Sequence, residues 1–434
     1  MKLKYTLMLF ILLNLCHTSH GQFLMDLIDT SKDMGKGMLA MYQKFDHIRV
    51  SGYMQPQFQV SGSKGIKSFS GGDFNPNVNN RFLLRRGRIR FDYIHFAEKK
   101  GPSVQFVFQF DGTERGVAIR DFWGRFLENR FNLFALTAGM FARPFSYELN
   151  LSSSDRESPE RGRLSQLLLK TERDLGAMVS FEPRKKDHPL YHLKFDVGVF
   201  NGQGLAAPSD FDSHKDIISR LSLKPVAFFK KHFFSTGLSY LNGGLLQNTA
   251  AISRLQFKNG QNSFVNDTSA SNIGSIAPRK YYGADAQFKF KTRAGFTELR
   301  AEFVSGRQSA TKNSTETPAA LLSGTEGYYV RDFNGAYFYF LHNIKNQRHQ
   351  LVVKYDWCDP NVKVAKNDIG NPATNFTAAD IKYTTLGFGY INYINPNFKA
   401  VFWYDLVKNE NTLLPGFTND LKDNVFTCRL QFRF

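Results

Sequence analysis

The sequence is poor in cysteine, in tryptophan and in long apolar runs, and each shortage excludes a class of protein. Three cysteines in 434 residues are too few for a disulfide framework. No histidine stands at metal-ligand spacing from Cys358 or Cys428, so we expect both to be inert packing residues and predict no metal site and no cofactor. No segment approaches 18 consecutive apolar residues, so membrane-spanning helices are not expected.

Acidic residues are also scarce. The chain has 38 Asp and Glu against 56 Lys and Arg, a net charge of +18, which indicates an affinity for anions. Aromatic residues are abundant, with 43 Phe and 18 Tyr, yet the mean hydropathy is -0.35. Chains that are rich in aromatics but polar on average are typical of transmembrane β-barrels, where lipid-facing and water-facing residues alternate.

The N-terminal part divides into two predicted segments. Residues 1–21 have the features of a secretory signal peptide, because Lys2 and Lys4 precede the apolar run Tyr5–Leu15. Residues 22–46 carry apolar side chains at roughly helical spacing and are predicted to form a periplasmic helical arm or an oligomer contact, with a pore plug as the alternative. The remaining residues, 47–434, are predicted to form a single β-strand domain.

From about residue 47 the chain consists of short runs in which apolar and polar residues alternate. Clear examples are 191–199, 282–291 and 398–406. Successive side chains of a strand point to opposite faces, and these runs have the length of a tilted membrane-spanning strand. About a dozen such runs in series predict an all-β fold, a transmembrane antiparallel β-barrel of about 16 strands with the short helical arm at its N-terminus.

The linkers between these runs support the same prediction. Bacterial barrels alternate short periplasmic turns with longer extracellular loops. The long linkers are 61–80, 144–173, 201–215, 241–280, 306–332, 358–381 and 407–423, and the shorter ones between them are 97–102, 182–190, 224–232, 292–295, 342–348 and 393–397. One link, 112–116, is short where a long one is due. The count of 16 puts both ends of the barrel on the periplasmic side.

The C-terminal stretch FTCRLQFRF alternates strictly and ends on Phe434. A last strand that ends on an aromatic residue is typical of barrels in the bacterial outer membrane, and we expect the protein to be located there.

The sequence does not indicate an enzyme. No Ser and His form a plausible catalytic arrangement, and the adjacent Asp187 and His188 lie in a predicted periplasmic turn beside Lys185 and Lys186, where a solvated charged turn is expected. Export to the outer membrane argues against nucleic acid as a partner of the basic residues. Small anions are the partners that we expect.

The stretch LRRGRIRFDY at 84–93 places Arg86, Arg88 and Arg90 on one face of a strand. Rings of Arg and Lys select anions in pores, and a guanidinium fork matches phosphate oxygens. Pairing with acids such as Asp92, Asp111 and Glu302 is the alternative, but the strand itself offers one acid for three arginines, which favours function. Further inward candidates are Lys194, Arg220, Lys289 and Arg300.

The linker 144–173 combines Arg156, Arg161 and Arg163 with the apolar run Leu167–Leu169. Three leucines in an extracellular loop need burial. We expect the loop to fold inward against the barrel wall and to narrow the pore with its arginines; burial at a subunit interface is the alternative.

The sequence resembles the phosphate-selective porin O/P family. The matching stretches follow family order and are RRGRIRFDY at 85–93, FQFDG at 108–112, LTAGMFARPFSYE at 136–148, ESPER at 157–161, ERDLG at 172–176 and GVFNGQG at 198–204. The resemblance implies a 16-stranded trimeric channel with an inward-folded third loop and an arginine-rich constriction. Arg86 and Arg88 match the family's basic strand, and Arg143 matches the basic position before a Pro-Phe pair.

These observations predict a passive, anion-preferring diffusion channel for phosphate or polyphosphate, in contact with outer-membrane lipid and assembled as a homotrimer. A general or organic-solute porin whose charges balance is the alternative. A barrel that only anchors a binding surface is a third hypothesis.

Overall fold

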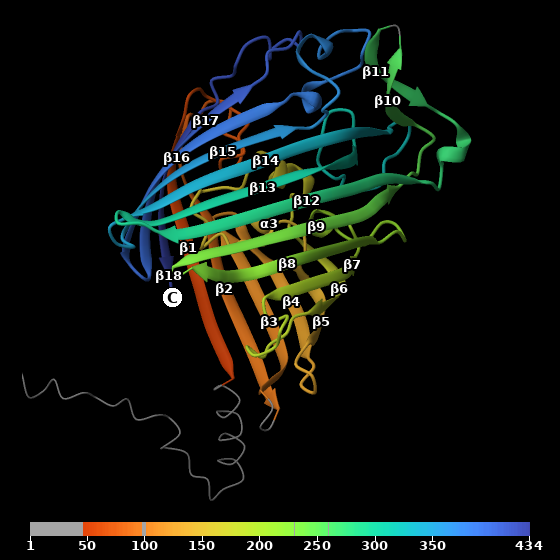
Figure 1. Cartoon of the computed structure of the whole chain (residues 1–434). Helices are drawn as coiled ribbons and strands as arrows, with labels where there is room; N and C mark the ends of the chain where they lie inside the picture. The colour runs from red at the N-terminus through yellow and green to blue at the C-terminus, as the bar shows by residue number, and fades with distance from the viewer. Residues whose placement is uncertain (1–46, 98–100, 230, 259) are drawn as a thin grey trace, which may run out of the picture.

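The computed structural model describes residues 47–434 except 98–100, 230 and 259 (Figure 1). The predicted signal peptide (1–21) and helical arm (22–46) lie outside the described residues. No helix in the described part of the chain has the length and apolar character needed to cross a membrane.

Sixteen of the described strands form one closed antiparallel barrel, as the alternation predicted. They are β1 (Ile48–Ser61), β2 (Asn80–Ala97), β3 (Gly101–Thr113), β4 (Gly116–Leu127), β5 (Phe134–Ala142), β6 (Arg173–Phe181), β7 (Leu193–Phe200), β8 (Asp216–Phe229), β9 (His232–Leu246), β12 (Ile276–Lys291), β13 (Gly295–Ala310), β14 (Tyr328–Ile344), β15 (His349–Asp359), β16 (Tyr383–Asn395), β17 (Phe398–Asn409) and β18 (Val425–Arg433). The barrel closes because β1 pairs with both β2 and β18, with Phe58 opposite Cys428 at the seam.

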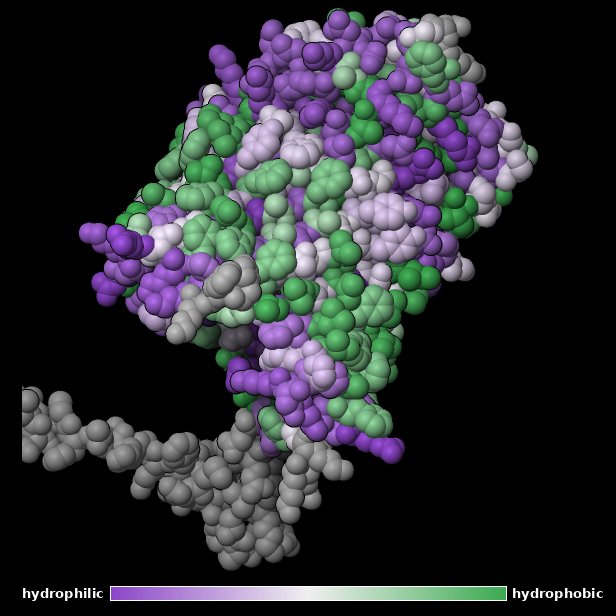
Figure 2. Space-filling view, in the orientation of Figure 1, coloured by the Kyte–Doolittle hydropathy of each residue, from purple (hydrophilic) through white to green (hydrophobic). Residues whose placement is uncertain are grey.

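Alternating side chains give the wall two different faces. On β17, Phe402 and Tyr404 are exposed on the outside while Val401 and Trp403 are buried inside. The last strand repeats the pattern, since Phe432 is exposed and Arg429 is buried. Apolar and weakly polar side chains cover the middle of the wall in Figure 2, with hydrophilic ones at its ends. An outer wall of this kind requires lipid around it, so the barrel spans a membrane.

The linkers have the predicted lengths. Each long linker lies at one end of the barrel and each short turn at the other, and the short link at 112–116 is a tight β3–β4 hairpin at the loop end, with Thr113 opposite Gly116. The segments near 116–126 and 216–240, which alternate poorly, are β4, β8 and β9. Bulges explain this for β4 and β8, because an extra residue exchanges the two faces of a strand. On β4 the extra residue is Arg120, opposite the step from Gln109 to Phe110 of β3, and on β8 it lies between Leu223 and Val226.

The loop end also contains structure that the sequence does not predict. Within the linker 241–280, β10 (Ile252–Lys258) and β11 (Gln261–Asp267) form a hairpin, and Ile252–Arg254 pair in parallel with Tyr328–Val330 of β14. Single-turn 3-10 helices lie in the loops: η2 (Gly204–Ala206), η3 (Ala270–Asn272), η4 (Lys366–Asp368) and η5 (Ala378–Asp380).

The segment between β5 and β6, residues 143–172 and here called the constriction loop, folds into the barrel. It contains α3 (Tyr147–Asn150) and α4 (Arg163–Leu168), and Figure 1 shows α3 inside the ring of strands. Leu168 and Leu169 are buried in an apolar cluster with Ile218 and Phe333 of the wall. The inward fold is therefore confirmed, and the leucines are covered within one chain. Cys358 packs in the same cluster, and it and Cys428 are free.

Candidate pore constriction

Two carboxylates hold the helical part of the constriction loop against the wall. Glu302 of β13 accepts hydrogen bonds from the backbone N–H groups of Tyr147 (3.3 Å) and Glu148 (3.1 Å). The Glu148 carboxylate in turn accepts from the N–H of Gly162 (2.9 Å) and the hydroxyl of Ser165 (2.6 Å). The two carboxylates therefore accept hydrogen bonds from backbone N–H groups of the loop that would otherwise have no partner inside the barrel.

The loop then crosses the lumen to the opposite wall. Ser153 Oγ lies 2.6 Å from the Tyr53 hydroxyl of β1, and Lys399 of β17 donates to the Ser154 carbonyl at 2.9 Å. Arg429 of β18 donates to the carbonyl of Pro159 at 2.7 Å. The loop therefore divides the interior into two spaces.

The three arginines of β2 are each paired with a different acid. Arg86 contacts Glu160 (2.8 Å), Arg88 contacts Asp111 (2.9 Å) and Arg90 contacts Asp92 (2.7 Å). The premise that one acid faces all three arginines was wrong, and the alternative of pairing with Asp92 and Asp111 holds for Arg90 and Arg88. Glu160, the partner of Arg86, comes from the constriction loop, and sequence spacing along one strand does not reveal it.

Glu160 is surrounded by three guanidinium groups. Arg85 (2.8 Å), Arg86 (2.8 Å) and Arg429 (2.9 Å) all contact its carboxylate. Burial raises the pKa of Glu160, but these arginines more than reverse that effect and hold the pKa well below its usual range. The carboxylate is therefore ionised at neutral pH.

Glu172 has a similar environment at the other end of the loop. Its Oε1 atom accepts from Arg120, from Arg161 (3.0 Å) and from Arg173 (2.7 Å), and Arg173 also contacts Asp121 (3.1 Å). Burial, and then the neighbouring Arg156, lower the pKa of Arg161 well below its usual range. The guanidinium nevertheless stays charged, because arginine does not lose its proton in proteins.

The set of arginines around Glu160 and Glu172, here called the arginine cluster, exceeds its acids. The cluster consists of Arg85, Arg86, Arg88, Arg120, Arg156, Arg161, Arg173 and Arg429, and the acids that pair with it are Asp111, Asp121, Glu160 and Glu172. Arg156 donates only to the carbonyls of Ser158 and Pro159 among the described residues. Even with Glu148 included, three positive charges are uncompensated.

Two cavities meet at this cluster. The outer vestibule, of about 1180 Å³, opens at the loop end, and a smaller pocket of about 310 Å³ lies on the side of Gly52 and Phe434. Arg88, Ser153 and Arg161 line both cavities. The boundary between the two cavities, here called the narrow point, is therefore bordered by two guanidinium groups and one hydroxyl.

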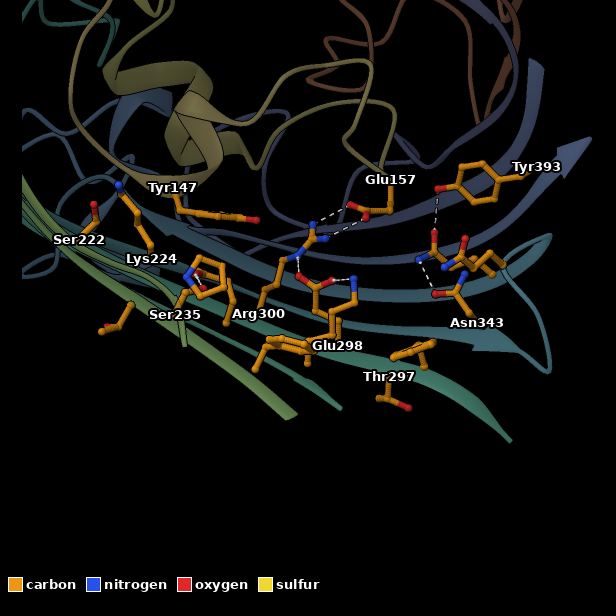
Figure 3. A pocket seen from close by; sticks show the side chains of 18 of the residues that line it. Tyr147, Glu157, Ser222, Lys224, Ser235, Thr297, Glu298, Arg300, Asn343 and Tyr393 are labelled. Carbon is orange, nitrogen blue, oxygen red and sulfur yellow. Dashed lines mark hydrogen bonds and ion pairs between the residues drawn. The ribbon is translucent and has the colours of Figure 1, made fainter. Parts of the chain in front are cut away.

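A third cavity of about 1270 Å³, here called the side chamber, lies between the constriction loop and the wall from β8 to β16. Figure 3 shows Arg300 between Glu157 of the loop and Glu298 of β13. Arg220 contacts Asp285 at 2.7 Å, and Lys289 lies 3.8 Å from Glu298. These predicted residues line one space, but each has an acidic partner.

Three of the predicted pore-lining residues, Arg143, Arg156 and Lys194, line none of these cavities, which is a correction. Arg143 is 4% exposed, contacts Asp174 (3.7 Å) and donates to the carbonyls of Gly202 (3.3 Å) and Thr171, so it fastens the base of the constriction loop. Arg156 is 3% exposed and contributes only its charge. Lys194 of β7 pairs with Asp196 (3.2 Å) and Glu182 (3.8 Å).

The other predicted residues remain within the lumen. Arg163 stacks on Tyr383, 3.5 Å from the ring centroid, at the edge of the outer vestibule.

Sequence reasoning missed three members of the cluster: Arg85, Arg120 and Arg429. Arg429 had a visible signal, since it lies on the inward face of the alternating C-terminal strand. Arg120 lies on β4, whose poor alternation concealed its direction.

Among the described residues, no group of three or more His, Cys, Asp or Glu is placed to hold a metal ion.

No known family model and no curated protein sequence matches the chain. Solved structures do match it. The outer membrane channel DcaP of Acinetobacter baumannii is 13% identical, covers 89% of this chain and 97% of its own, and gives a TM-score of 0.52. A loop-deletion mutant of OmpT, an outer membrane protein of Vibrio cholerae, is 8% identical, with 89% and 99% coverage and a TM-score of 0.49. A mutant of the Rh. blastica porin is 10% identical, with 89% and 100% coverage and a TM-score of 0.45.

At these identities the similarity shows the fold alone. It rests on DcaP, whose TM-score of 0.52 is the highest of these three. The protein has the closed 16-strand barrel of outer-membrane channels, and its apolar outer wall places it in the bacterial outer membrane.

Proposed function

We propose that the protein is a passive outer-membrane diffusion channel that prefers anions, and that phosphate or polyphosphate is its solute. The observation that carries this proposal is the surplus of guanidinium groups where the outer vestibule meets the smaller pocket. A positive potential in a narrow, low-dielectric passage raises the local concentration of anions and repels cations.

The groups at the narrow point suit a phosphate ion. Arg88 and Arg161 offer planar forks that match two phosphate oxygens, and the Ser153 hydroxyl adds a donor or acceptor. Because Asp111 and Glu172 already hold these guanidinium groups in place, a passing anion meets a fixed site. Competition from the same acids keeps binding weak enough for release.

We propose in addition that residues 1–21 direct export and that the protein belongs with the phosphate-selective O/P porins. We also propose that it assembles as a homotrimer and works as a channel rather than as an enzyme. The motifs between 85 and 204 support the family assignment.

A general or organic-solute porin is the second candidate. The paired charges of the side chamber favour it, because Arg220, Lys289 and Arg300 all face acids and impose little selectivity there. In that case the side chamber is the main passage.

Phosphate block of chloride current separates the two candidates. We expect inorganic phosphate, added to purified protein in a planar bilayer in KCl, to reduce the chloride conductance in a saturable way. Substitution of Arg88 and Arg161 by Gln should abolish the block, whereas substitution of Arg220 and Lys289 should leave it intact. A current that phosphate does not affect supports the general porin, and the absence of any current supports a barrel that is only an anchor.

A further inference from the structure

Two like charges lie opposite each other on the outer wall of the barrel. Lys280 of β12 and Arg307 of β13 are register partners, and both point outward because the next residues, Tyr281 and Gln308, are buried inside. Cations directly opposite on one face of a sheet repel each other and destabilise the pairing. Lys280 has no ion pair or hydrogen bond with any described side chain, so within the described chain no acid contacts Lys280 itself.

Asp332 contacts two of the neighbouring basic residues, Arg307 and Lys363, but compensates only one of their charges. Asp332 of β14 lies opposite Arg307, accepts from its Nε at 2.8 Å and also contacts Lys363 Nζ at 3.2 Å. The side chains of Arg307 and Lys363 are still 53% and 58% exposed. The patch of Lys280, Arg307, Asp332 and Lys363 therefore carries two surplus positive charges toward the surroundings.

An apolar groove of about 490 Å³ begins directly beside this patch on the membrane side. Tyr282 and Ser305, which border the groove, are register partners two residues nearer the middle of the wall than Lys280 and Arg307. The floor is made of small outward residues and the sides of large ones: Ser219, Ala284 and Ser305 below, and Phe195, Leu238, Tyr282 and Phe303 around them. The strands β8, β9, β12 and β13 of this wall face the viewer in Figures 1 and 2.

We propose that this surface binds a phosphate-bearing lipid of the outer leaflet, with the headgroup phosphate between Lys280 and Arg307 and an acyl chain in the groove. The Arg307 fork and the Lys280 ammonium supply donors for the phosphate oxygens, and the anion removes the repulsion between the two cations. Cations just beyond the apolar belt attract anionic headgroups, and the position at the loop end selects the outer leaflet. The inference does not depend on what passes through the lumen.

The test is a titration of the purified protein in detergent with dioleoyl phosphatidic acid, followed by native mass spectrometry. The matched probes are dioleoylglycerol, which has the same chains without phosphate, and inorganic phosphate alone. We expect only the phosphate lipid to bind saturably, and we expect Lys280→Gln with Arg307→Gln to weaken its binding about 30-fold. The control pair Lys312→Gln with Arg115→Gln removes the same charges from other exposed loop-end positions and should leave binding unchanged.

Both substituted side chains are exposed, so folding is not at risk, and unchanged circular dichroism of the barrel verifies this. Unchanged lipid binding in the Lys280/Arg307 variant overturns the proposal, as does equal binding of dioleoylglycerol or of inorganic phosphate. The same spectra report the oligomer. A variant that loses its oligomeric state while keeping its lipid affinity shows that a second copy of the chain, and not a lipid, occupies the groove.

Discussion

The arginine cluster and the side chamber lie in one barrel and contain the same kinds of basic residue, but they differ in charge balance. In the cluster, eight guanidinium groups face four paired acids, and Glu160 and Glu172 are each shared by three arginines. In the chamber, five basic residues face four acids, and Arg300 contacts two of these acids, Glu157 and Glu298. The basic residues are Arg220, Lys224, Lys289, Arg300 and Arg348, and the acids are Glu157, Glu182, Asp285 and Glu298. The proposed anion preference therefore rests on the surplus positive charge of the arginine cluster and does not rest on the number of basic residues that line the lumen.

The largest effect should come from removing charge at the narrow point. Arg88→Gln with Arg161→Gln deletes two cations and leaves Asp111 without one partner, so the ratio of anion to cation permeability should fall about tenfold or more. Reversal potentials in a KCl gradient measure this ratio. Arg220→Gln with Lys289→Gln removes the same charge from the side chamber and should leave the ratio within about twofold of the wild type. An equal fall of the permeability ratio in both double variants would show that the arginine cluster and the side chamber contribute equally to selectivity.

The ratio of anion to cation permeability should change in the opposite direction, upward, in the variant Glu160→Gln. The variant removes the acid shared by Arg85, Arg86 and Arg429 while keeping a similar shape, so the permeability ratio should rise about fivefold. Glu298→Gln in the side chamber is the matched control and should change the ratio less. A fall in anion preference for Glu160→Gln would show that Glu160 mainly positions the loop and that the arginines are not poised for anions.

The barrel was accessible from the sequence because alternation, linker parity and the C-terminal Phe434 are local signals repeated along the chain. The poor alternation of β4 and β8 has a physical cause in the bulges next to Gln109 and Leu223. The β10–β11 hairpin was missed because its pairing with β14 joins segments more than 70 residues apart, which no local pattern reports.

The site was only partly predictable. The direction of Arg86 and Arg88 followed from strand periodicity, and the burial of Leu168 followed from its apolar run. Ion pairing did not follow, because Glu160, Asp111 and Glu172 reach the arginines through tertiary contacts. Arg143 was assigned to the pore from a motif alone, whereas Asp174 and Gly202 hold it in the base of the loop.

A moderate effect is expected from loosening the constriction loop. Leu168→Ala removes a buried side chain from the cluster that holds the loop inward and should destabilise that packing by about 2–5 kcal/mol. Hydrogen exchange should become faster for the amides of 147–168, while the strands of the wall keep their protection. Leu413→Ala, at an exposed loop position, is the control. Unchanged exchange in 147–168 would mean that Glu302 and Glu148 alone hold the loop.

The smallest effect is the response to pH. The pKa of Glu160 lies well below its usual range, so its pairing energy is fully present above the unfolded pKa of about 4.3 and is lost as the pH falls through the lower folded value. Burial raises the pKa of Asp423, which borders the outer vestibule, to about 6, so the permeability ratio should rise slightly between about pH 7 and pH 5. It should rise again only in stronger acid, where Glu160 is protonated. Glu160→Gln should lack the second rise and keep the first. A second rise that persists in Glu160→Gln would place another group in control of the cluster.

The most direct test of the central claim is the reversal potential of the unmodified protein in a planar bilayer separating two KCl concentrations. We predict a potential whose sign reports chloride as the more permeant ion, since the arginine cluster has at least three uncompensated positive charges at the point where its two cavities meet. A potential near zero or of the opposite sign would show that the acids of the lumen balance or outweigh the arginines, and would contradict the account.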